Sequence, residues 1–320
     1  MESLVVKPAV SVVMPVFDPP LEMLAAAIES ILLQTFRDFE FLLLDDGSLD
    51  QQTRFYLDLA ATRDPRVRVF HEPHRGLTPT LNRGFELARG EFIARQDADD
   101  WSEPERFSRQ VDYLRAHSEV ALAGTDTELH RADGKPLWRL RLPHTSRELA
   151  RAFPHSNPFV HGSTMYRREL ALAIGGYREQ FPCSQDYDFF WRMAERAGAV
   201  NLDEVLYHYR YSRGAVSAQR AADQALVHRA ARTLAQARER GDPEDIGAAL
   251  AAAGEQTPSG GFEARLKQAD HVMLAGDFSG ACRAYLDLLR SHPASTLAWA
   301  KLFRLAVFAA FPAAREVSFR

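Results

Sequence analysis

Cysteine is scarce in this 320-residue sequence, which contains only Cys183 and Cys282, and neither lies in a C-x-x-C or Cys/His spacing. Two isolated cysteines argue against a disulfide framework or a zinc site, and they are typical of a reducing compartment. A surplus of positive charge is also missing, because the formal net charge is −4. Without a basic field, we expect no nucleic-acid partner.

Long apolar runs are absent too. A membrane-spanning helix needs about 20 apolar residues, and the nearest candidate, residues 297–311, is shorter and carries Lys301 and Arg304. The first residues, MESLVVKPAV, lack the basic segment and apolar core of a signal peptide. We therefore expect a cytoplasmic protein. The aromatic stripe through Trp299 and Phe303 fits a buried helix face and leaves open a peripheral contact at the inner face of the membrane.

Three glycine-containing motifs are missing. No G-x-G-x-x-G follows the first apolar run, and no G-x-x-x-x-G-K-[ST] occurs anywhere. A dinucleotide-binding oxidoreductase and a P-loop NTPase therefore lose their main support. The absence of a G-x-S-x-G elbow weakens the case for a hydrolase.

The first two thirds of the chain do contain alternating strand and helix patterns. This alternation predicts βαβ units and a mainly parallel sheet. Gly90 is expected to end one helix, and a capping box at Ser102–Glu105 is expected to begin the next. From about residue 215 the sequence is rich in Ala, Arg and Leu, which predicts a helical tail packed on the main domain. Residues 266–306 resemble one tetratricopeptide-type unit, but fewer than three repeats are visible, so no solenoid is expected. The predicted strands are 10–17, 39–48 (strand into turn), 67–72, 90–95 and 120–130, and the predicted helices are 21–34, 51–62, 79–90 and 102–116.

Acidic residues follow several of these strands. Asp18 comes after the first, Asp45 and Asp46 after the second, and Asp97, Asp99 and Asp100 after the fourth. Each alone could belong to a turn or a helix cap, but ligands of parallel sheets bind beyond the carboxyl ends of the strands. Two carboxylates in the order Asp97-x-Asp99 can converge on one hard cation, magnesium or manganese. Asp100 stays open as a water-mediated ligand or a neighbour of the next helix start.

A second acidic position lies at the start of a predicted amphipathic helix, where Asp186 is followed by Asp188. Asp186 could cap the helix. It could equally act as a general base that accepts a hydroxyl proton from a substrate. Its position alone leaves both interpretations open.

Seven segments follow one another in the order found in the family 2 glycosyltransferases, and the chain resembles that family over residues 8–217. The resemblance implies a GT-A fold, Rossmann-like with a mainly parallel sheet flanked by helices, in residues 1–217. A separate helical C-terminal region would then occupy 218–320 and contact partners or the acceptor. The segments are VSVVMPVF, FLLLDDGS, LNRGFELARGEFIARQDADD, PFVHGSTMYRR, GGYREQF, QDYDFFWRM and VLYHYRYSRGAVS.

The resemblance also implies roles for the matched residues. Asp97 and Asp99 would form the DXD motif and bind Mn²⁺ or Mg²⁺ under the donor diphosphate, and Asp186 would be the catalytic base. Gln185 replaces a glutamate of the family, and Tyr211 stands where a histidine is frequent, so no histidine ligand is expected from the closing loop. The nucleotide and donor residues would be Pro15, Val16, Asp18, Asp46, Arg75, Asn82, Asp97 and Ala98. The acceptor side and closing loop would contain His161, Gln185, Arg210 and Ser217.

The sequence thus predicts an inverting, metal-dependent glycosyltransferase of the hexosyltransferase type. It would move a sugar from a nucleoside-diphosphate sugar, UDP being the nucleotide usual in the family, to a hydroxyl of a saccharide, lipid-linked or protein acceptor. Synthesis of a surface polysaccharide or glycoconjugate would fit, and a homo-oligomer stays open. One alternative is a non-catalytic scaffold that binds a nucleotide sugar and recruits partners through its helical tail. A sugar-nucleotide pyrophosphorylase would need a basic glycine-rich loop where this chain reads FDPPLEM.

Overall fold

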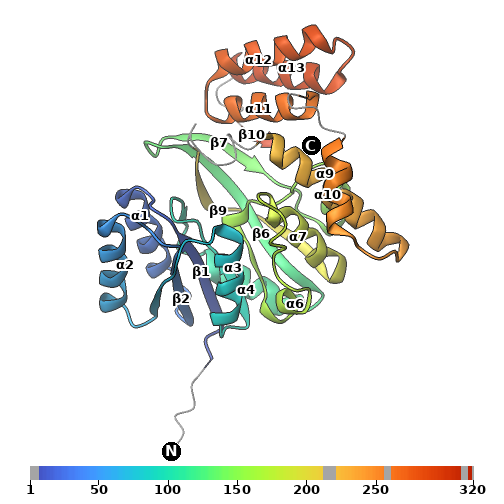
Figure 1. Cartoon of the computed structure of the whole chain (residues 1–320). Helices are drawn as coiled ribbons and strands as arrows, with labels where there is room; N and C mark the ends of the chain where they lie inside the picture. Colours follow the sequence, from blue (N-terminus) through green and yellow to red (C-terminus); the bar gives the residue numbers. More distant parts are fainter. Residues whose placement is uncertain (1–6, 212–220, 256–260, 311–315, 319–320) are drawn as a thin grey trace, which may run out of the picture.

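The computed structural model describes residues 7–211, 221–255, 261–310 and 316–318. A twisted sheet with helices on both faces forms the larger part, and a group of helices lies above one edge of it (Figure 1). No helix within the described ranges is both long enough and apolar enough to cross a lipid bilayer.

The first half of the sheet is parallel, with the order β3-β2-β1-β4. The residues of β1 and β2 are almost all buried, as continuous apolar runs require when helices cover both faces. One core layer joins β1 to α1 and α4, and the opposite layer joins β2 to α3 and α7. These strands are β1 (Val10–Val16), β2 (Phe39–Asp45), β3 (Val67–His71) and β4 (Phe92–Arg95). The helices are α1 (Leu21–Leu32), α2 (Gln51–Arg63), α3 (Leu77–Leu87) and α4 (Arg106–Ala116).

The second half of the sheet is mixed. β8 runs antiparallel between β4 and β6, while the long β6 pairs parallel with β9 and antiparallel with β7. The β6–β7 connection is a short turn, which can only return the chain antiparallel. The predicted α/β class is therefore confirmed, with a parallel half and a mixed half. The strands are β5 (Trp101–Ser102), β6 (Val120–Arg131), β7 (Pro136–Arg141), β8 (Met165–Arg167) and β9 (Gly198–Tyr211). The helices are α5 (Ser146–Ala152), η1 (His161–Ser163), α6 (Arg168–Ala173) and α7 (Gln185–Arg196).

Two predicted helix boundaries are wrong. The helix α3 ends at Leu87, and Gly90 instead lies against β1, where a Cβ atom would come within 2.6 Å of the Ser11 backbone nitrogen. Ser102 does not cap a helix, because it lies in β5 and its hydroxyl donates to Gln96 Oε1 at 2.8 Å. The helix α4 begins at Arg106 without a side-chain cap. Buried polar contacts thus outweigh the local capping pattern.

The C-terminal region is helical, as predicted. Helices α11, α12 and α13 share their own small core, in which Met273, Tyr285 and Leu305 are buried. A short strand, β10 (Glu316–Ser318), was not predicted and pairs with β7. The proposed boundary between residues 217 and 218 falls outside the described residues. The helices are α9 (Ala221–Arg240), α10 (Ile246–Glu255), α11 (Phe262–Leu274), α12 (Phe278–Ser291) and α13 (Thr296–Ala310).

Candidate active site

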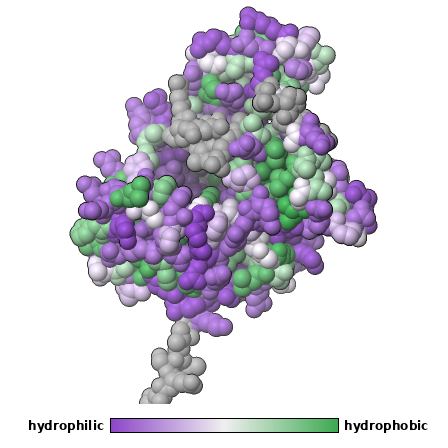
Figure 2. Space-filling model, viewed as in Figure 1, coloured by the Kyte–Doolittle hydropathy of each residue, from purple (hydrophilic) through white to green (hydrophobic). Residues whose placement is uncertain are grey.

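The carboxyl ends of β1, β2 and β4 meet at one edge of the sheet, as the parallel pairing requires. Figure 2 shows a hollow with hydrophilic side chains on the face between the lobe that carries α1 and α2 and the C-terminal helices. The residues that follow these three strands include the acidic positions singled out from the sequence. Their geometry decides which of them are available to a ligand.

Asp97 and Asp99 are the acids least committed to protein contacts. Asp97 receives one hydrogen bond on Oδ1, from Arg95 Nη2 at 2.5 Å. No side chain among the described residues donates a hydrogen bond to the Asp99 carboxylate. Asp99 is exposed as a residue, but protein atoms crowd the carboxyl group, and this desolvation together with the charge of Asp97 raises its pKa to about 6. The two carboxylates repel each other, and together they offer the oxygen donors that a divalent ion prefers.

Asp100 has a different role. Its side chain is fully buried, Oδ2 accepts the Tyr207 hydroxyl at 2.7 Å, and Oδ1 accepts the Arg210 backbone N–H at 2.7 Å. Burial and the neighbouring acids raise its pKa well above the ordinary value. Both oxygens are therefore used to attach β9 to the end of β4, and Asp100 acts as a structural anchor.

Gly162 makes room for this arrangement. A Cβ atom at this position would lie 1.9 Å from the Tyr207 hydroxyl oxygen and 2.7 Å from Asp97 Oδ2. Only a glycine allows the η1 turn to pass this close to both groups. The contact between η1 and the acidic motif thus depends on a residue without a side chain.

Asp186 lies at the second position of α7, where Asn157 Nδ2 donates to its Oδ2 at 2.6 Å. The pKa of Asp186 is raised to about 6. Burial and, to a smaller extent, the charge of Asp97 raise it, whereas backbone N–H groups at the helix start lower it in part. The residue before the helix, Ser184, has a left-handed backbone with φ of 49°. Strain of this kind is often found at functional sites. A carboxylate with a pKa near neutrality is suited to proton transfer.

His161 lies beside Tyr177 and Phe190, and Gln185 directly precedes Asp186 in α7. The Nε2 atom of His161 is 2.9 Å from the Tyr177 hydroxyl, and burial lowers the pKa of His161 well below its ordinary value, so the ring is neutral. Gln185 is the first residue of α7 and is buried. An uncharged His161 can exchange a hydrogen bond but adds no positive charge to the site.

Two of the residues predicted to bind the nucleotide, Asp46 and Asp18, accept hydrogen bonds from the backbone of neighbouring loops. Asp46 accepts the backbone N–H groups of Arg75 and Gly76 at 2.7 and 3.0 Å, which brings the loop after β3 to the end of β2. Asp18 accepts the backbone N–H groups of Leu49 and Asp50, both at 3.0 Å. Both carboxylates therefore shape the loops at the carboxyl ends of β1 and β2.

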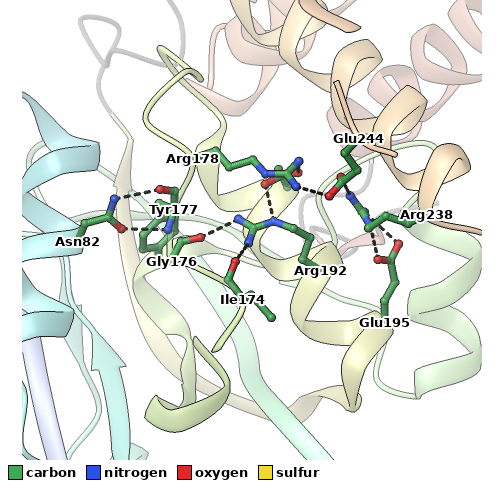
Figure 3. Close-up of polar contacts among 10 residues, drawn as sticks. Asn82, Ile174, Gly176, Tyr177, Arg178, Arg192, Glu195, Arg238 and Glu244 are labelled. Atoms are coloured by element: carbon green, nitrogen blue, oxygen red, sulfur yellow. Dashed lines mark hydrogen bonds and ion pairs between the residues drawn. The ribbon is translucent and has the colours of Figure 1, made fainter. Parts of the chain in front are cut away.

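The other predicted donor residues differ in how they are placed. The amide group of Asn82 is fully engaged, because Nδ2 donates to the Tyr177 carbonyl and Oδ1 accepts the Tyr177 N–H, both at 2.9 Å (Figure 3). Val16 and Ala98 are buried in the first core layer, and Pro15 lies next to Leu44 in the sheet. The Arg75 guanidinium is exposed and contacts Glu72 at 2.8 Å.

Arg210 lies at the end of β9. Its Nη1 donates to the Asp99 carbonyl oxygen at 2.6 Å, and its guanidinium lies 4.4 Å from the centre of the Trp101 ring. Burial lowers its pKa, but an arginine stays protonated at neutral pH. Ser217, predicted for the same loop, lies outside the described residues.

A buried ion-pair network supports α7 behind Asp186. Arg192 donates to the carbonyls of Ile174 and Gly176 and to Asp188, which is also bonded by Arg178. The network continues through Glu244 and Arg238 into the C-terminal helices (Figure 3). Asp188 is thus structural, and the helix that carries Asp186 is tied to the C-terminal region.

Some important residues were not found from the sequence. Asn157 and Tyr207 lie 29 and 107 positions from the aspartates that they contact, so no local pattern reveals them. Arg95 is fully buried beside Asp97, but in the sequence it is only the last residue of a predicted strand. These contacts arise from the tertiary fold.

Comparison with known proteins identifies related sequences. Residues 11–175, just over half of the chain, match the family model described as glycosyl transferase family 2. The putative glycosyltransferase EpsE of Bacillus subtilis (strain 168) is 33% identical over 63% of this chain and 73% of its own length. The amylovoran biosynthesis glycosyltransferase AmsE of Erwinia amylovora is 30% identical over 62% and 74%. Two other curated relatives are much longer, and the alignments span less than a quarter of their length.

Solved structures share the fold. The mannosyltransferase PcManGT from Pyrobaculum calidifontis, in complex with GDP-Man and Mn²⁺, has a TM-score of 0.57 and 17% identity, over 96% of this chain and 82% of that one. TarS 1–349 of S. aureus, in complex with UDP-GlcNAc, has a TM-score of 0.56 and 16% identity, over 87% and 83%. At these identities the likeness concerns the fold alone.

Proposed function

This chain belongs to glycosyl transferase family 2, and we propose that it transfers a sugar from a nucleoside-diphosphate sugar to an acceptor hydroxyl with inversion at the anomeric carbon. The observation that carries the proposal is the placement of Asp186. Its pKa is raised to about 6, in part by the charge of Asp97, so the base lies within electrostatic reach of the acidic pair. The relatives named as glycosyltransferases support an enzyme of this class.

The acidic pair fits a divalent ion such as Mn²⁺ or Mg²⁺. Asp99 has no described side-chain donor, and the charge of Asp97 helps to raise its pKa. When bound by Asp97 and Asp99, the ion would offset the negative charge of the donor diphosphate. Asp100 is not proposed as a ligand, because Tyr207 and Arg210 use both of its oxygens.

The protein groups around the ion position the reaction. Asp186 would accept the proton of the acceptor hydroxyl, and Asn157 would hold the carboxylate in place through Oδ2. Deprotonation makes the hydroxyl oxygen a stronger nucleophile, which attacks the anomeric carbon while the nucleoside diphosphate leaves from the opposite face. Arg210, close to Asp99, would add positive charge on the diphosphate side.

For the donor and the acceptor we propose chemical classes rather than individual compounds. Neighbouring folds have been solved with UDP-GlcNAc and with GDP-Man, which supports a nucleotide-sugar donor. We propose UDP as the first nucleotide to test. Relatives named for amylovoran and O-antigen biosynthesis support a polysaccharide or a lipid-linked saccharide as acceptor.

The proposal is tested by incubating the chain with UDP-, GDP- and TDP-sugars and Mn²⁺ or Mg²⁺, and by measuring release of the nucleoside diphosphate with and without saccharide acceptors. We expect turnover with one donor class, dependent on the divalent ion. Binding of a nucleotide sugar without any turnover, across the donor and acceptor panel, would favour a non-catalytic scaffold instead.

A further inference from the structure

A second group of metal-binding side chains lies on the mixed half of the sheet. Glu128 and His130 are two residues apart on β6 and so point to the same face. His208 on β9 is the direct register partner of Glu128. Both histidines are buried, while the Glu128 side chain is 36% exposed. The three residues come from two strands 78 positions apart, which is why cysteine and histidine spacing in the sequence gave no sign of them.

One atom of each side chain converges on a common point. His130 Nε2 lies 3.0 Å from His208 Nδ1 and 2.9 Å from Glu128 Oε2, and His208 Nδ1 lies 3.7 Å from the same oxygen. Tetrahedral zinc sites have metal–nitrogen distances near 2.05 Å, which places their ligand atoms about 3.3 Å apart. The three measured separations lie on both sides of that value.

Each histidine ring has one nitrogen that faces the cluster (the inner nitrogen) and one that faces away from it (the outer nitrogen). The hydrogen bond made by the outer nitrogen decides whether the inner nitrogen has a lone pair for a metal. His130 Nδ1 faces the Gly134 carbonyl at 3.0 Å, and His208 Nε2 faces Glu103 Oε1 at 2.6 Å. Both partners are acceptors, so each outer nitrogen carries the hydrogen. In the neutral rings, His130 Nε2 and His208 Nδ1 then present lone pairs to each other and to a carboxylate. A histidine that donates its other N–H to a carbonyl or carboxylate is the usual arrangement in metal sites.

A second cluster on the structure has a similar composition but already includes a positively charged side chain. Asp126, His144 and Asp203 also lie close together, but the Arg139 guanidinium contacts both acids, at 3.4 and 3.8 Å. That group already contains a cation. Among the described residues, no lysine or arginine forms an ion pair with Glu128. Of these two groups among the described residues, the one on β6 and β9 is the one whose acid has no Lys or Arg partner.

We propose that Glu128, His130 and His208 bind a divalent transition-metal ion, and that the ion is zinc. Two imidazole nitrogens and one carboxylate oxygen are a donor set of zinc sites that keep an open position. The partly exposed Glu128 leaves the fourth position to water. This site is separate from the Asp97 and Asp99 pair, and the proposal departs from the expectation, based on cysteine and histidine spacing, that the chain has no zinc site.

The bound ion would join β6 to β9 beside the donor site. Trp101 on β5 stacks on His208 with ring centres 4.9 Å apart, and Arg210 lies over the same tryptophan. Arg210 in turn donates to Asp99 and Asp100. A metal on His208 would therefore hold the end of β9 in the position from which Arg210 reaches the acidic motif.

The test uses the full chain, stripped with a chelator, then titrated with ZnCl₂ by calorimetry and with CoCl₂ by visible absorption. We expect one zinc ion per chain and the intense visible bands of a tetrahedral cobalt site. Both should be lost in His208→Gln and in Glu128→Gln. Glu103→Ala, which removes the outer hydrogen-bond acceptor of His208, should weaken zinc binding by about 10–100-fold.

Two control variants distinguish this site from the others. Asp99→Asn alters the donor site and His144→Gln alters the group that already contains Arg139, and both should keep the cobalt bands. Absence of stoichiometric zinc binding or of these bands in the wild-type chain, which requires no variant to fold, would overturn the proposal. Loss of zinc in Asp99→Asn but not in His208→Gln would also overturn it, because the ion would then sit at the donor site.

Discussion

The Asn157 amide donates a hydrogen bond to Asp186 Oδ2 across 2.6 Å, and no described side chain donates to Oδ1. Asn157 thus fixes the carboxylate through one oxygen. We expect Asp186→Asn to lower kcat by about 10²–10⁴, the usual contribution of a general base, while the affinity for the donor nucleotide changes little. Steady-state kinetics and nucleotide calorimetry check this pair of results. An active Asp186→Asn enzyme would show that Asp186 is not the base.

The same contact predicts a change in pH dependence. The Asn157 hydrogen bond stabilises the ionised carboxylate and so lowers the pKa of Asp186, which burial holds at about 6. The base acts only when ionised, so kcat of the wild type should rise with pH through about 6. In Asn157→Ala the pKa of Asp186 rises, and this limb should move to higher pH. A profile that stays in place or moves to lower pH would refute the role given to Asn157.

Gly162 predicts a steric effect on the donor site. The Cβ atom of an alanine would overlap the Tyr207 hydroxyl and crowd Asp97, and overpacking of this kind costs about 1–3 kcal/mol. We expect Gly162→Ala to lower the melting temperature and to weaken metal-dependent nucleotide binding. Gly247→Ala on α10 is the matched control, because its nearest contact is 3.4 Å. If both variants behaved alike, close packing at Gly162 would not matter.

The raised pKa of Asp99 predicts how the stability of the folded chain varies with pH when no metal is present. The pKa of Asp99 in the folded chain is about 6, above its ordinary value of 3.8. The folded state therefore binds the proton more tightly than the unfolded state, and stability falls as pH rises from about 4 to about 6. Asparagine cannot ionise, so Asp99→Asn should melt higher than the wild type at pH 8 in chelator.

Two comparisons check that effect. The difference in melting temperature between Asp99→Asn and the wild type should shrink at pH 4, where Asp99 is protonated, and also at high salt, which screens the repulsion from Asp97. Asp112→Asn, an exposed substitution on α4, should show no such pH dependence. A wild type that melts higher than Asp99→Asn at pH 8 without metal would contradict the repulsion between the two acids.

Much of the fold follows from the sequence because its signals are local. The apolar runs of β1 and β2, and the alternation with α1, α2 and α3, depend only on nearby residues. The order of strands beyond β4 depends on which distant segments pair, such as β6 with β9, and residue spacing does not encode that. Ser102 illustrates the limit, because its contact with Gln96 replaces the cap that its local sequence predicts.

The candidate site likewise contains residues that a local sequence pattern indicates and residues that only the tertiary fold brings in. Asp97, Asp99 and Asp186 could be proposed from the sequence because each follows a strand or begins a helix, where acids are available to ligands. Asp100 looked the same in the sequence, yet burial and the Tyr207 and Arg210 contacts make it structural. Partners of this kind, and the convergence of Glu128, His130 and His208, exist only once β9 is in place.

Calorimetric titration of UDP into the wild type and into Asp99→Ala, each with and without Mn²⁺, tests the central claim most directly. A UDP-dependent enzyme that uses Asp97 and Asp99 should bind UDP in the wild type only when Mn²⁺ is present, and Asp99→Ala should lose most of that metal-dependent affinity. Unchanged UDP affinity in Asp99→Ala with Mn²⁺, or equal affinity in the wild type with and without the ion, would contradict the proposed site.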